Sequence, residues 1–180
     1  RIPYLAAEPE RVARWRQRIG DQGFRIGIVW QGNPKAPVDR NRSVPLAVFA
    51  PIAALRGARL FALQKGPGED TEAPFALDRL GPEMDNGPDW FLDTAAAIMA
   101  LDLVVTVDTA VLHLAGALGR PALMLTHGRN SDWRWQQGRE DTVWYPSVKL
   151  VRCPDGNADW QGAAARAAFL IRTGNLPPAA

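Results

Sequence analysis

The stretch that decides the fold is LDLVVTVDTAVLHLAGALG, residues 101–119. It opens with a largely β-branched run, residues 103–107, whose length is typical of a buried parallel strand. Asp108 and Thr109 follow as capping residues, and an alanine- and leucine-rich segment then keeps helical spacing as far as Gly119. The pattern therefore predicts a strand, a tight turn and a helix. The free amides of that helix would point out of the carboxyl edge of the sheet, where α/β proteins bind ligands and where anions are favoured.

Similar strand and helix patterns alternate along the rest of the chain. Strands are expected at residues 25–30, 59–64, 121–125 and 148–151. Helices are expected at residues 8–20, 44–55, 90–100 and 159–173, and Pro51 is expected to kink or divide the second of them. Residues 69–89 give a weaker pattern, in which we expect a helical turn at 75–80 and a short edge segment at 84–88. The alternation predicts an α/β fold with a doubly wound, mostly parallel sheet that is covered by helices on both faces.

The composition is that of an ordinary globular domain, since 47% of the 180 residues are hydrophobic. We expect a linker helix over residues 1–22, a Rossmann-like domain over 23–176 and a tail over 177–180. The net charge is only +2 and no lysine-rich run is present, so nucleic acid is not expected as a partner. Because the sequence does not begin with methionine, we expect it to be part of a longer chain.

Cysteine content and hydropathy bear on where the protein works. The single cysteine, Cys153, cannot form an internal disulfide, which favours a reducing compartment and therefore a cytoplasmic location. No apolar run approaches the about 20 residues that a membrane span needs. We therefore expect no transmembrane segment.

Several well-known motifs are absent from the sequence. The first strand is not followed by G-x-G-x-x-G, and neither the phosphate-binding G-x-x-x-x-G-K-[ST] nor the hydrolase G-x-S-x-G occurs. The two histidines, His113 and His127, lack the spacing of metal ligands. A kinase, a hydrolase and a metal-dependent enzyme are therefore disfavoured.

Polar and small residues gather in the loops that follow the expected strands, and in a parallel sheet these loops share one edge. Thr109 and Ala110 are small enough to let a diphosphate approach the helix amides. Lys65, Arg40 or Arg42 would neutralise its charge. Further candidates in these loops are Gln31, Gly32, Asn33, Gln64, Asp108 and His113, and a neighbouring groove is expected to be lined by Trp133, Trp135 and His127.

Each of these residues also has a purely structural interpretation. Asp108 or Thr109 would be only a helix cap, His113 a hydrogen-bonded core histidine and Lys65 a solvated loop residue. Trp133 and Trp135 would pack against another domain instead of a ligand. The convergence of the candidates on one edge of the sheet favours a ligand site.

Residues 101–121 resemble the donor-binding segment of the ADP-heptose:lipopolysaccharide heptosyltransferase family, in which Asp-Thr-Gly precedes His, Leu and Ala and then Gly-x-Pro. A longer series of motifs, spread over residues 3–173, is still more similar to the C-terminal, glycosyltransferase-like region of bacterial tetratricopeptide-repeat proteins. These motifs are WQGNP (30–34), DRNRS (39–43), LQK (63–65), DTAA (93–96), DWRW (132–135) and WYP (144–146).

The resemblance implies a GT-B glycosyltransferase, of which this chain would be the C-terminal, nucleotide-sugar-binding half. The backbone at Asp108, Thr109 and Ala110 would hold the diphosphate, and the Asp108 carboxylate would meet a sugar hydroxyl. His113 would support that loop or touch a phosphate. Lys65 and the loop that contains Trp30, Gly32 and Asn33 would face the same donor.

The same resemblance implies the partners and the chemistry of the complete protein. The donor substrate would be a nucleotide-diphosphate sugar, and transfer would need neither a metal nor a cofactor. The acceptor would be a sugar, a lipid-linked glycan or a protein. An N-terminal half-domain and tetratricopeptide repeats would complete the full-length chain.

Two departures from the family pattern leave the activity open. Ala110 stands where the family has glycine, which leaves less room for a phosphate. The general base of such inverting transferases lies in the N-terminal half, so no catalytic residue is assigned and the isolated chain is expected to bind a donor weakly and to catalyse little. The alternative is a degenerate, non-catalytic module that acts as a protein-interaction scaffold. A dinucleotide oxidoreductase ranks below both because its glycine fingerprint is missing.

Overall fold

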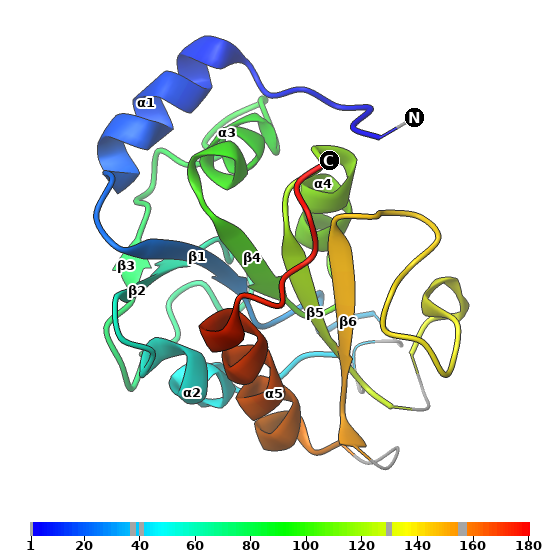
Figure 1. Ribbon diagram of the computed structural model, residues 1–180. Helices are drawn as coiled ribbons and strands as arrows, with labels where there is room; N and C mark the ends of the chain where they lie inside the picture. Colours follow the sequence, from blue (N-terminus) through cyan, green and yellow to red (C-terminus); the bar gives the residue numbers. More distant parts are fainter. Residues whose placement is uncertain (1, 37–38, 40–41, 129–130, 155–157) are drawn as a thin grey trace.

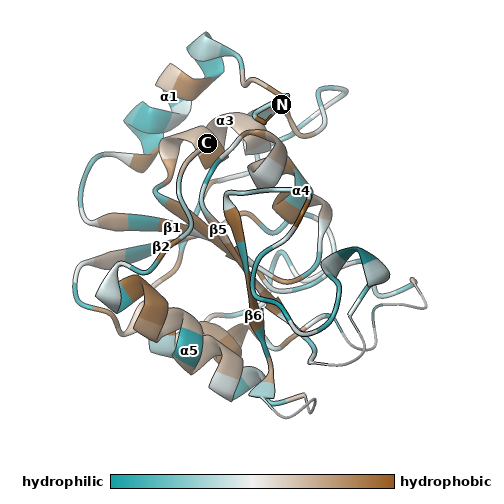
Figure 2. Cartoon of the chain, turned by 45° about the vertical axis from the view of Figure 1, so that its right-hand side comes forward, coloured by the Kyte–Doolittle hydropathy of each residue, from teal (hydrophilic) through white to brown (hydrophobic). Residues whose placement is uncertain are grey.

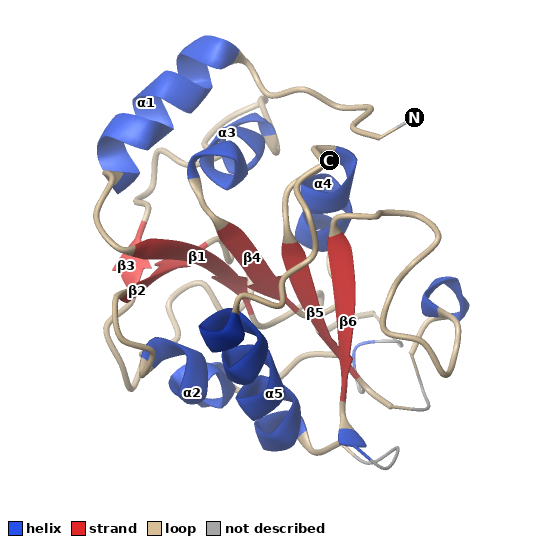
Figure 3. Ribbon diagram, viewed as in Figure 1, coloured by secondary structure: helices blue, strands red, loops and turns tan. Residues whose placement is uncertain are grey.

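The structure is a computed structural model that describes residues 2–36, 39, 42–128, 131–154 and 158–180. In this part of the chain, parallel strands form one six-stranded sheet with helices on both faces (Figures 1 and 3). The strands are β1 (Phe24–Val29), β2 (Ala58–Ala62), β3 (Asp78–Arg79), β4 (Leu103–Thr106), β5 (Ala122–Thr126) and β6 (Val148–Arg152). The predicted α/β fold is confirmed, and the sheet is entirely parallel among the described strands.

The strand order, β3-β2-β1-β4-β5-β6, fixes where a ligand can bind. Ile26 of β1 lies opposite Leu60 of β2 on one side and opposite Leu103 of β4 on the other. The chain therefore leaves β1 in one direction and later returns to its other side. Such a reversal opens a crevice at the carboxyl ends of the two central strands, here β1 and β4.

Two layers of helices enclose two hydrophobic cores. Helices α1 (Pro9–Ile19), α3 (Leu92–Ala100) and α4 (Ala110–Ala117) cover one face, whereas α2 (Ala50–Ala53) and α5 (Trp160–Thr173) cover the other. Figure 2 shows hydrophobic strands in the centre and hydrophilic residues on the outer side of α1. Strands β4 and β5 are buried along their whole length, as expected for central strands of a parallel sheet.

Helix α1, expected to be a linker, packs closely on the domain. Its stripe of Val12, Trp15 and Ile19 is buried in the same core as α3. The Trp15 indole nitrogen donates to the Asp93 carboxylate at the start of α3, at 2.9 Å. The helix therefore forms part of the packed unit.

Pro51 divides one helix as expected, whereas two other local expectations differ from the structure. The helix expected at 44–55 is divided into a 3-10 turn, η2 (Leu46–Phe49), and the short α2, because Pro51 lies at the start of the α-helix and cannot donate the amide that a continuous helix needs. The helical turn at 75–80 and the edge segment at 84–88 were both wrong. The edge strand is instead β3, which is two exposed residues long and therefore leaves no hydrophobic pattern.

The C-terminal tail is held against the domain. The Ala180 amide donates to the Gly119 carbonyl at 2.9 Å, and Pro177 is buried. Residues 177–180 therefore follow the surface next to the turn between α4 and β5. Within the described residues, no helix combines the length and apolar character that crossing a membrane requires.

Candidate functional site

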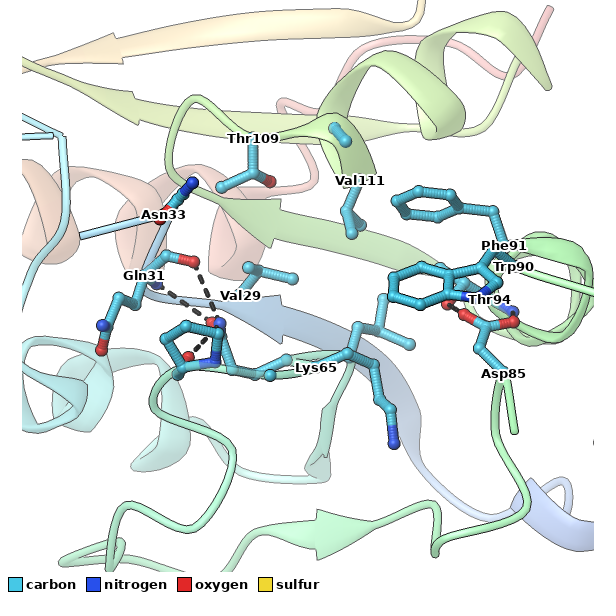
Figure 4. Close-up of a pocket in the computed structure, with 16 residues that line it drawn as sticks. Val29, Gln31, Asn33, Lys65, Asp85, Trp90, Phe91, Thr94, Thr109 and Val111 are labelled. Atoms are coloured by element: carbon cyan, nitrogen blue, oxygen red, sulfur yellow. Dashed lines mark hydrogen bonds between the residues drawn. The ribbon is translucent and has the colours of Figure 1, made fainter. Parts of the chain in front are cut away.

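A cavity of about 410 Å³ lies at the crevice between β1 and β4. It is lined by Val29 and residues 31–33 after β1, residues 63–67 after β2, Asp85, Trp90, Phe91 and Thr94 around the start of α3, and residues 109–111 at the start of α4. In Figure 4, Gln31 and Asn33 lie on one side and Trp90 and Phe91 on the other. The cavity therefore occupies the position where doubly wound sheets bind their ligands.

The amino end of α4 opens into this cavity. Thr109 has an extended backbone, and its hydroxyl lies 3.1 Å from the Thr106 hydroxyl instead of capping the helix. The amides of Ala110 and Val111 consequently have no hydrogen-bond acceptor in the described part of the chain. Free amides at a helix start attract an anion, because they add to the positive end of the helix dipole.

Helix α3 also begins at the cavity, but its first amides are occupied. The Asp85 carboxylate accepts hydrogen bonds from the Asp93 amide at 3.0 Å and from the Thr94 amide at 3.1 Å. Just before this helix, Trp90 and Phe91 form an aromatic wall, with Trp90 75% exposed. This side of the cavity therefore offers apolar surface, and the anion-binding end is that of α4.

Gln64 ties together the loops that follow β1 and β2. Its side-chain oxygen accepts from the amides of Trp30 at 3.2 Å and Gln31 at 3.0 Å. Its side-chain nitrogen donates to the carbonyls of Gln31 at 3.0 Å and Pro67 at 2.8 Å. The amide side chain of Gln64 is fully used in this way, so it shapes the cavity and has no group left for a ligand.

The predicted basic residues are paired with acids. The Lys65 ammonium lies 2.8 Å from the Glu69 carboxylate and points away from Thr109 in Figure 4. The hydrogen bond from Lys65 lowers the pKa of Glu69, so the acid is ionised at neutral pH. Arg42 pairs with Asp39 at 3.2 Å and lies against Gly32, outside the lining of the cavity. The positive potential of the cavity therefore comes mainly from the α4 amides.

Asp108 and His113 lie beside the cavity rather than in its lining, in a separate cluster with two aromatic residues. The Trp135 indole nitrogen donates to Asp108 Oδ2 at 2.9 Å, and its ring stacks on His113 with centroids 5.3 Å apart. His113 Nδ1 is 3.0 Å from the Tyr145 hydroxyl, and Nε2 is 4.0 Å from Asp108 Oδ1. Burial lowers the pKa of His113, against the opposing effect of Asp108.

The predicted groove of Trp133, Trp135 and His127 does not form. Trp135 is buried, whereas Trp133 is 72% exposed and packs edge-to-face with Trp144, at a centroid distance of 6.4 Å. His127 is also buried and packs on Trp160 of α5. The three side chains have separate environments, since Trp135 is the only buried residue of the 3-10 turn η3 (Trp133–Trp135) and His127 packs elsewhere.

The structure thus brings some of the predicted residues together and separates others. Gly32, Asn33, Gln64, Lys65, Thr109 and Ala110 line the cavity. Trp30, expected in the loop that faces the donor, does not line the cavity, because its side chain is 1% exposed and belongs to the core under the opposite face of the sheet. Arg40 lies outside the described residues.

The aromatic wall of Trp90 and Phe91 was not predicted from the sequence. Trp90 and Phe91 were assigned to the following helix, although the helix starts only at Leu92. The adjacent GPDW segment, residues 87–90, carries a glycine and a proline that indicate a loop. Two aromatic residues directly after such a loop could have been recognised as exposed.

Together these features define a Rossmann-like α/β domain with a ligand cavity at its topological switch point. Residues 88–141 match the family model of glycosyltransferase family 9 (heptosyltransferase). This segment runs from the aromatic wall through β4, α4 and β5 to the residues after η3. The aromatic wall and helix α4 therefore lie within the matched part, whereas the loops after β1 and β2 lie outside it.

Known proteins resemble the chain along most of its length. Protein FlbA of Caulobacter vibrioides (strain ATCC 19089 / CIP 103742 / CB 15) is 33% identical in an alignment 181 residues long, which covers 96% of this chain and 29% of FlbA. The structure of E. coli ADP-heptose lps heptosyltransferase II has a TM-score of 0.59 at 16% identity, over 94% of this chain and 54% of that one. The structure of E. coli heptosyltransferase WaaC with ADP has a TM-score of 0.58 at 17% identity, over 89% of this chain and 48% of that one. The chain thus has a heptosyltransferase-like fold and spans about half of those structures and less than a third of FlbA.

Proposed function

We propose that this chain is the donor-binding half of a GT-B glycosyltransferase that transfers a sugar from a nucleotide diphosphate. The observation that carries the proposal is the open amino end of α4, whose first two amides have no acceptor among the described residues and open into a cavity at the switch point. A diphosphate fits this position because it is anionic and because Ala110 is small and exposed. The same amides would stabilise the leaving diphosphate, so the reaction would need no metal.

The two sides of α4 fit the two ends of such a donor. The apolar wall of Trp90 and Phe91 suits the flat face of a nucleobase. On the other side, Asp108 Oδ1 has no hydrogen-bond donor among the described residues and suits a sugar hydroxyl. We infer that the nucleoside lies toward α3 and the sugar toward Asp108 and His113.

The remaining parts of the reaction would come from outside this cavity. An N-terminal half-domain would close the cleft and supply the general base, and tetratricopeptide repeats would present the acceptor. That acceptor would be a sugar, a lipid-linked glycan or a protein, and the reaction would take place in the cytoplasm. The match to family 9 and the partial coverage of the similar structures support this arrangement.

Titration calorimetry with ADP, GDP and UDP tests the proposal on the chain itself. We expect at least one of them to bind with a millimolar or lower Kd, and Ala110→Asp to weaken that binding about tenfold or more, because its carboxylate repels the diphosphate. An acid in the first helical turn also stabilises the helix, so the fold should survive. Ala110→Asn, whose side chain has the size of aspartate but no charge, is the matched control and should lose little affinity for the nucleotide. No binding by any of the three nucleotides, or equal losses in both variants, would contradict the proposal.

A second prediction concerns the Lys65–Glu69 ion pair. Glu69→Gln removes the charge that neutralises Lys65, so we expect the nucleoside diphosphate to bind about threefold more tightly at low salt. Asp70→Asn makes the same change of net charge at an exposed neighbour and should have a smaller effect. If both variants bind the nucleoside diphosphate with equal affinity, Lys65 takes no part in recognition of the anion.

The alternative function is a non-catalytic interaction module derived from a transferase. The pairing of Lys65 and Arg42 with acids favours it, and so do the exposed indoles of Trp133 and Trp144. Transfer by the full-length protein that persists unchanged when Asp108 and Lys65 are both replaced by alanine would support this alternative.

A further inference from the structure

Tyr145 lies next to His113, although the two residues are 32 positions apart in the sequence. The Tyr145 hydroxyl is 3.0 Å from His113 Nδ1, and the two rings meet edge-to-face with centroids 5.8 Å apart. Tyr145 comes from the segment just before β6, whereas His113 is on α4. A long-range contact of this kind holds the imidazole in one orientation.

The surrounding residues leave Tyr145 little freedom to move. Its ring packs directly over Gly116 of α4, where a Cβ atom would overlap the aromatic carbons. The residue is 8% exposed and belongs to the core that α4 shares with the sheet. The hydroxyl has one other neighbour among the described side chains, the Tyr4 hydroxyl at 3.5 Å. Tyr145 therefore presents its hydroxyl to His113 in a fixed position.

The position of Asp108 decides which nitrogen of the neutral imidazole carries the proton. His113 Nε2 is 4.0 Å from Asp108 Oδ1, so a lone pair on Nε2 would face a carboxylate oxygen. A proton on Nε2 turns this repulsion into attraction. Nδ1 then has the lone pair and can accept a hydrogen bond from Tyr145. One tautomer therefore satisfies both neighbours, and the other does not.

We propose that Tyr145 is a positioning residue, whose hydroxyl donates to His113 Nδ1 and thereby keeps the imidazole proton on Nε2, beside Asp108 and the open end of α4. His113 then offers an uncharged N–H donor to an oxygen of the bound donor substrate. This role of His113 rests on the proposed function, whereas the hydrogen bond from Tyr145 and the tautomer concern the protein alone. The ring stacked on His113, that of Trp135, holds Asp108 in place through its indole N–H.

The electrostatic surroundings agree with this assignment. The charged groups that face His113 are Asp108 and Asp132, which favour the imidazolium, and Arg134, which opposes it. Burial has the largest effect and lowers the pKa of His113, so the ring is neutral at pH 7. Burial likewise raises the pKa of Tyr145, so its hydroxyl keeps the proton that it donates.

Nitrogen-15 NMR of the imidazole rings tests the tautomer directly, because the chain has only two histidines. His113→Gln assigns the His113 signals by their disappearance. At pH 7 we expect the wild-type spectrum to show a protonated Nε2 and an unprotonated, hydrogen-bonded Nδ1. In Tyr145→Phe, which keeps the ring but removes the donor, the Nδ1 signal should move toward that of a mixture of tautomers. Tyr4→Phe, which removes the neighbouring hydroxyl, is the matched control and should leave the signals in place.

The outcomes separate this inference from the proposed function. A protonated Nδ1 in the wild type, or an unchanged His113 signal in Tyr145→Phe, overturns the positioning role whatever the chain binds. If a sugar linked to ADP, GDP or UDP binds to the wild type, Tyr145→Phe should lower the affinity for that nucleotide sugar about fivefold, as expected for one hydrogen bond. Tyr4→Phe should leave the affinity unchanged. Equal affinities would overturn the recognition role of His113. No binding to the wild type would instead refute the proposed function and leave the tautomer result valid.

Discussion

Replacement of Asp93 by alanine should lower the free energy of unfolding by about 3 kcal/mol, which corresponds to about 9 °C in Tm for a chain of this size. The Asp93 side chain is 6% exposed and accepts hydrogen bonds from Trp15 at 2.9 Å, from Arg11 at 3.3 Å and from Arg14. Without the carboxylate, the buried indole N–H loses its acceptor. The two arginines lose the charge that attaches α1 to α3. Urea denaturation, followed by tryptophan fluorescence, measures the change.

Asp89→Ala is the matched control for this prediction. Asp89 also pairs with Arg11, at 2.8 Å, but its side chain is 53% exposed, and exposed ion pairs contribute little to stability. A loss for Asp89→Ala as large as that for Asp93→Ala would show that burial is not the cause.

The Asp93 effect should also depend on pH. Burial alone raises the pKa of Asp93, but hydrogen bonds from Trp15 and Arg11 and the nearby positive charges outweigh it and leave the pKa below the usual 3.8. The stabilisation is therefore complete well above pH 3.8 and is lost as the pH falls through the lower, folded-state value. We expect the difference between wild type and Asp93→Ala to shrink at acidic pH. A difference that stayed constant down to pH 2 would contradict a role for the charge.

The second large effect is expected for Gln64→Met, which keeps the length of the side chain and removes its polar atoms. It leaves the amides of Trp30 and Gln31 and the Pro67 carbonyl without their partners at the edge of the cavity. We expect a loss of about 2 kcal/mol in the free energy of unfolding, since an unpaired buried group costs about 1 kcal/mol or more and the Trp30 amide is buried while the other two groups are half-buried or exposed. Because the β1 and β2 loops would separate, nucleotide binding should also weaken.

Gln31→Met is the matched control for that prediction, because the Gln31 side chain makes no hydrogen bond within the described part of the chain. It should have little effect on urea denaturation. Equal destabilisation by the two variants would mean that the loss comes from the methionine and not from the broken bridge.

Local patterns in the sequence determined the fold and predicted where the candidate site lies. The β-branched run at 103–107, the small residues at 109 and 110 and the glycine at 119 predict β4, α4 and the turn between them, and the structure has these elements. Local information is sufficient here because strand length, helical spacing and turn chemistry are properties of neighbouring residues. The position at the carboxyl edge then follows from the parallel topology.

Tertiary structure alone decided which side chains meet. From the sequence, Lys65 was expected either to neutralise a diphosphate or to be solvated, and only the folded loop places Glu69 against it. Trp30 and Trp133 were both expected beside a ligand, yet one is 1% and the other 72% exposed. The Tyr145–His113 contact joins residues that are far apart in the chain. Such pairings depend on the packing of the whole domain, because burial and ion pairing are set by neighbours in space rather than along the chain.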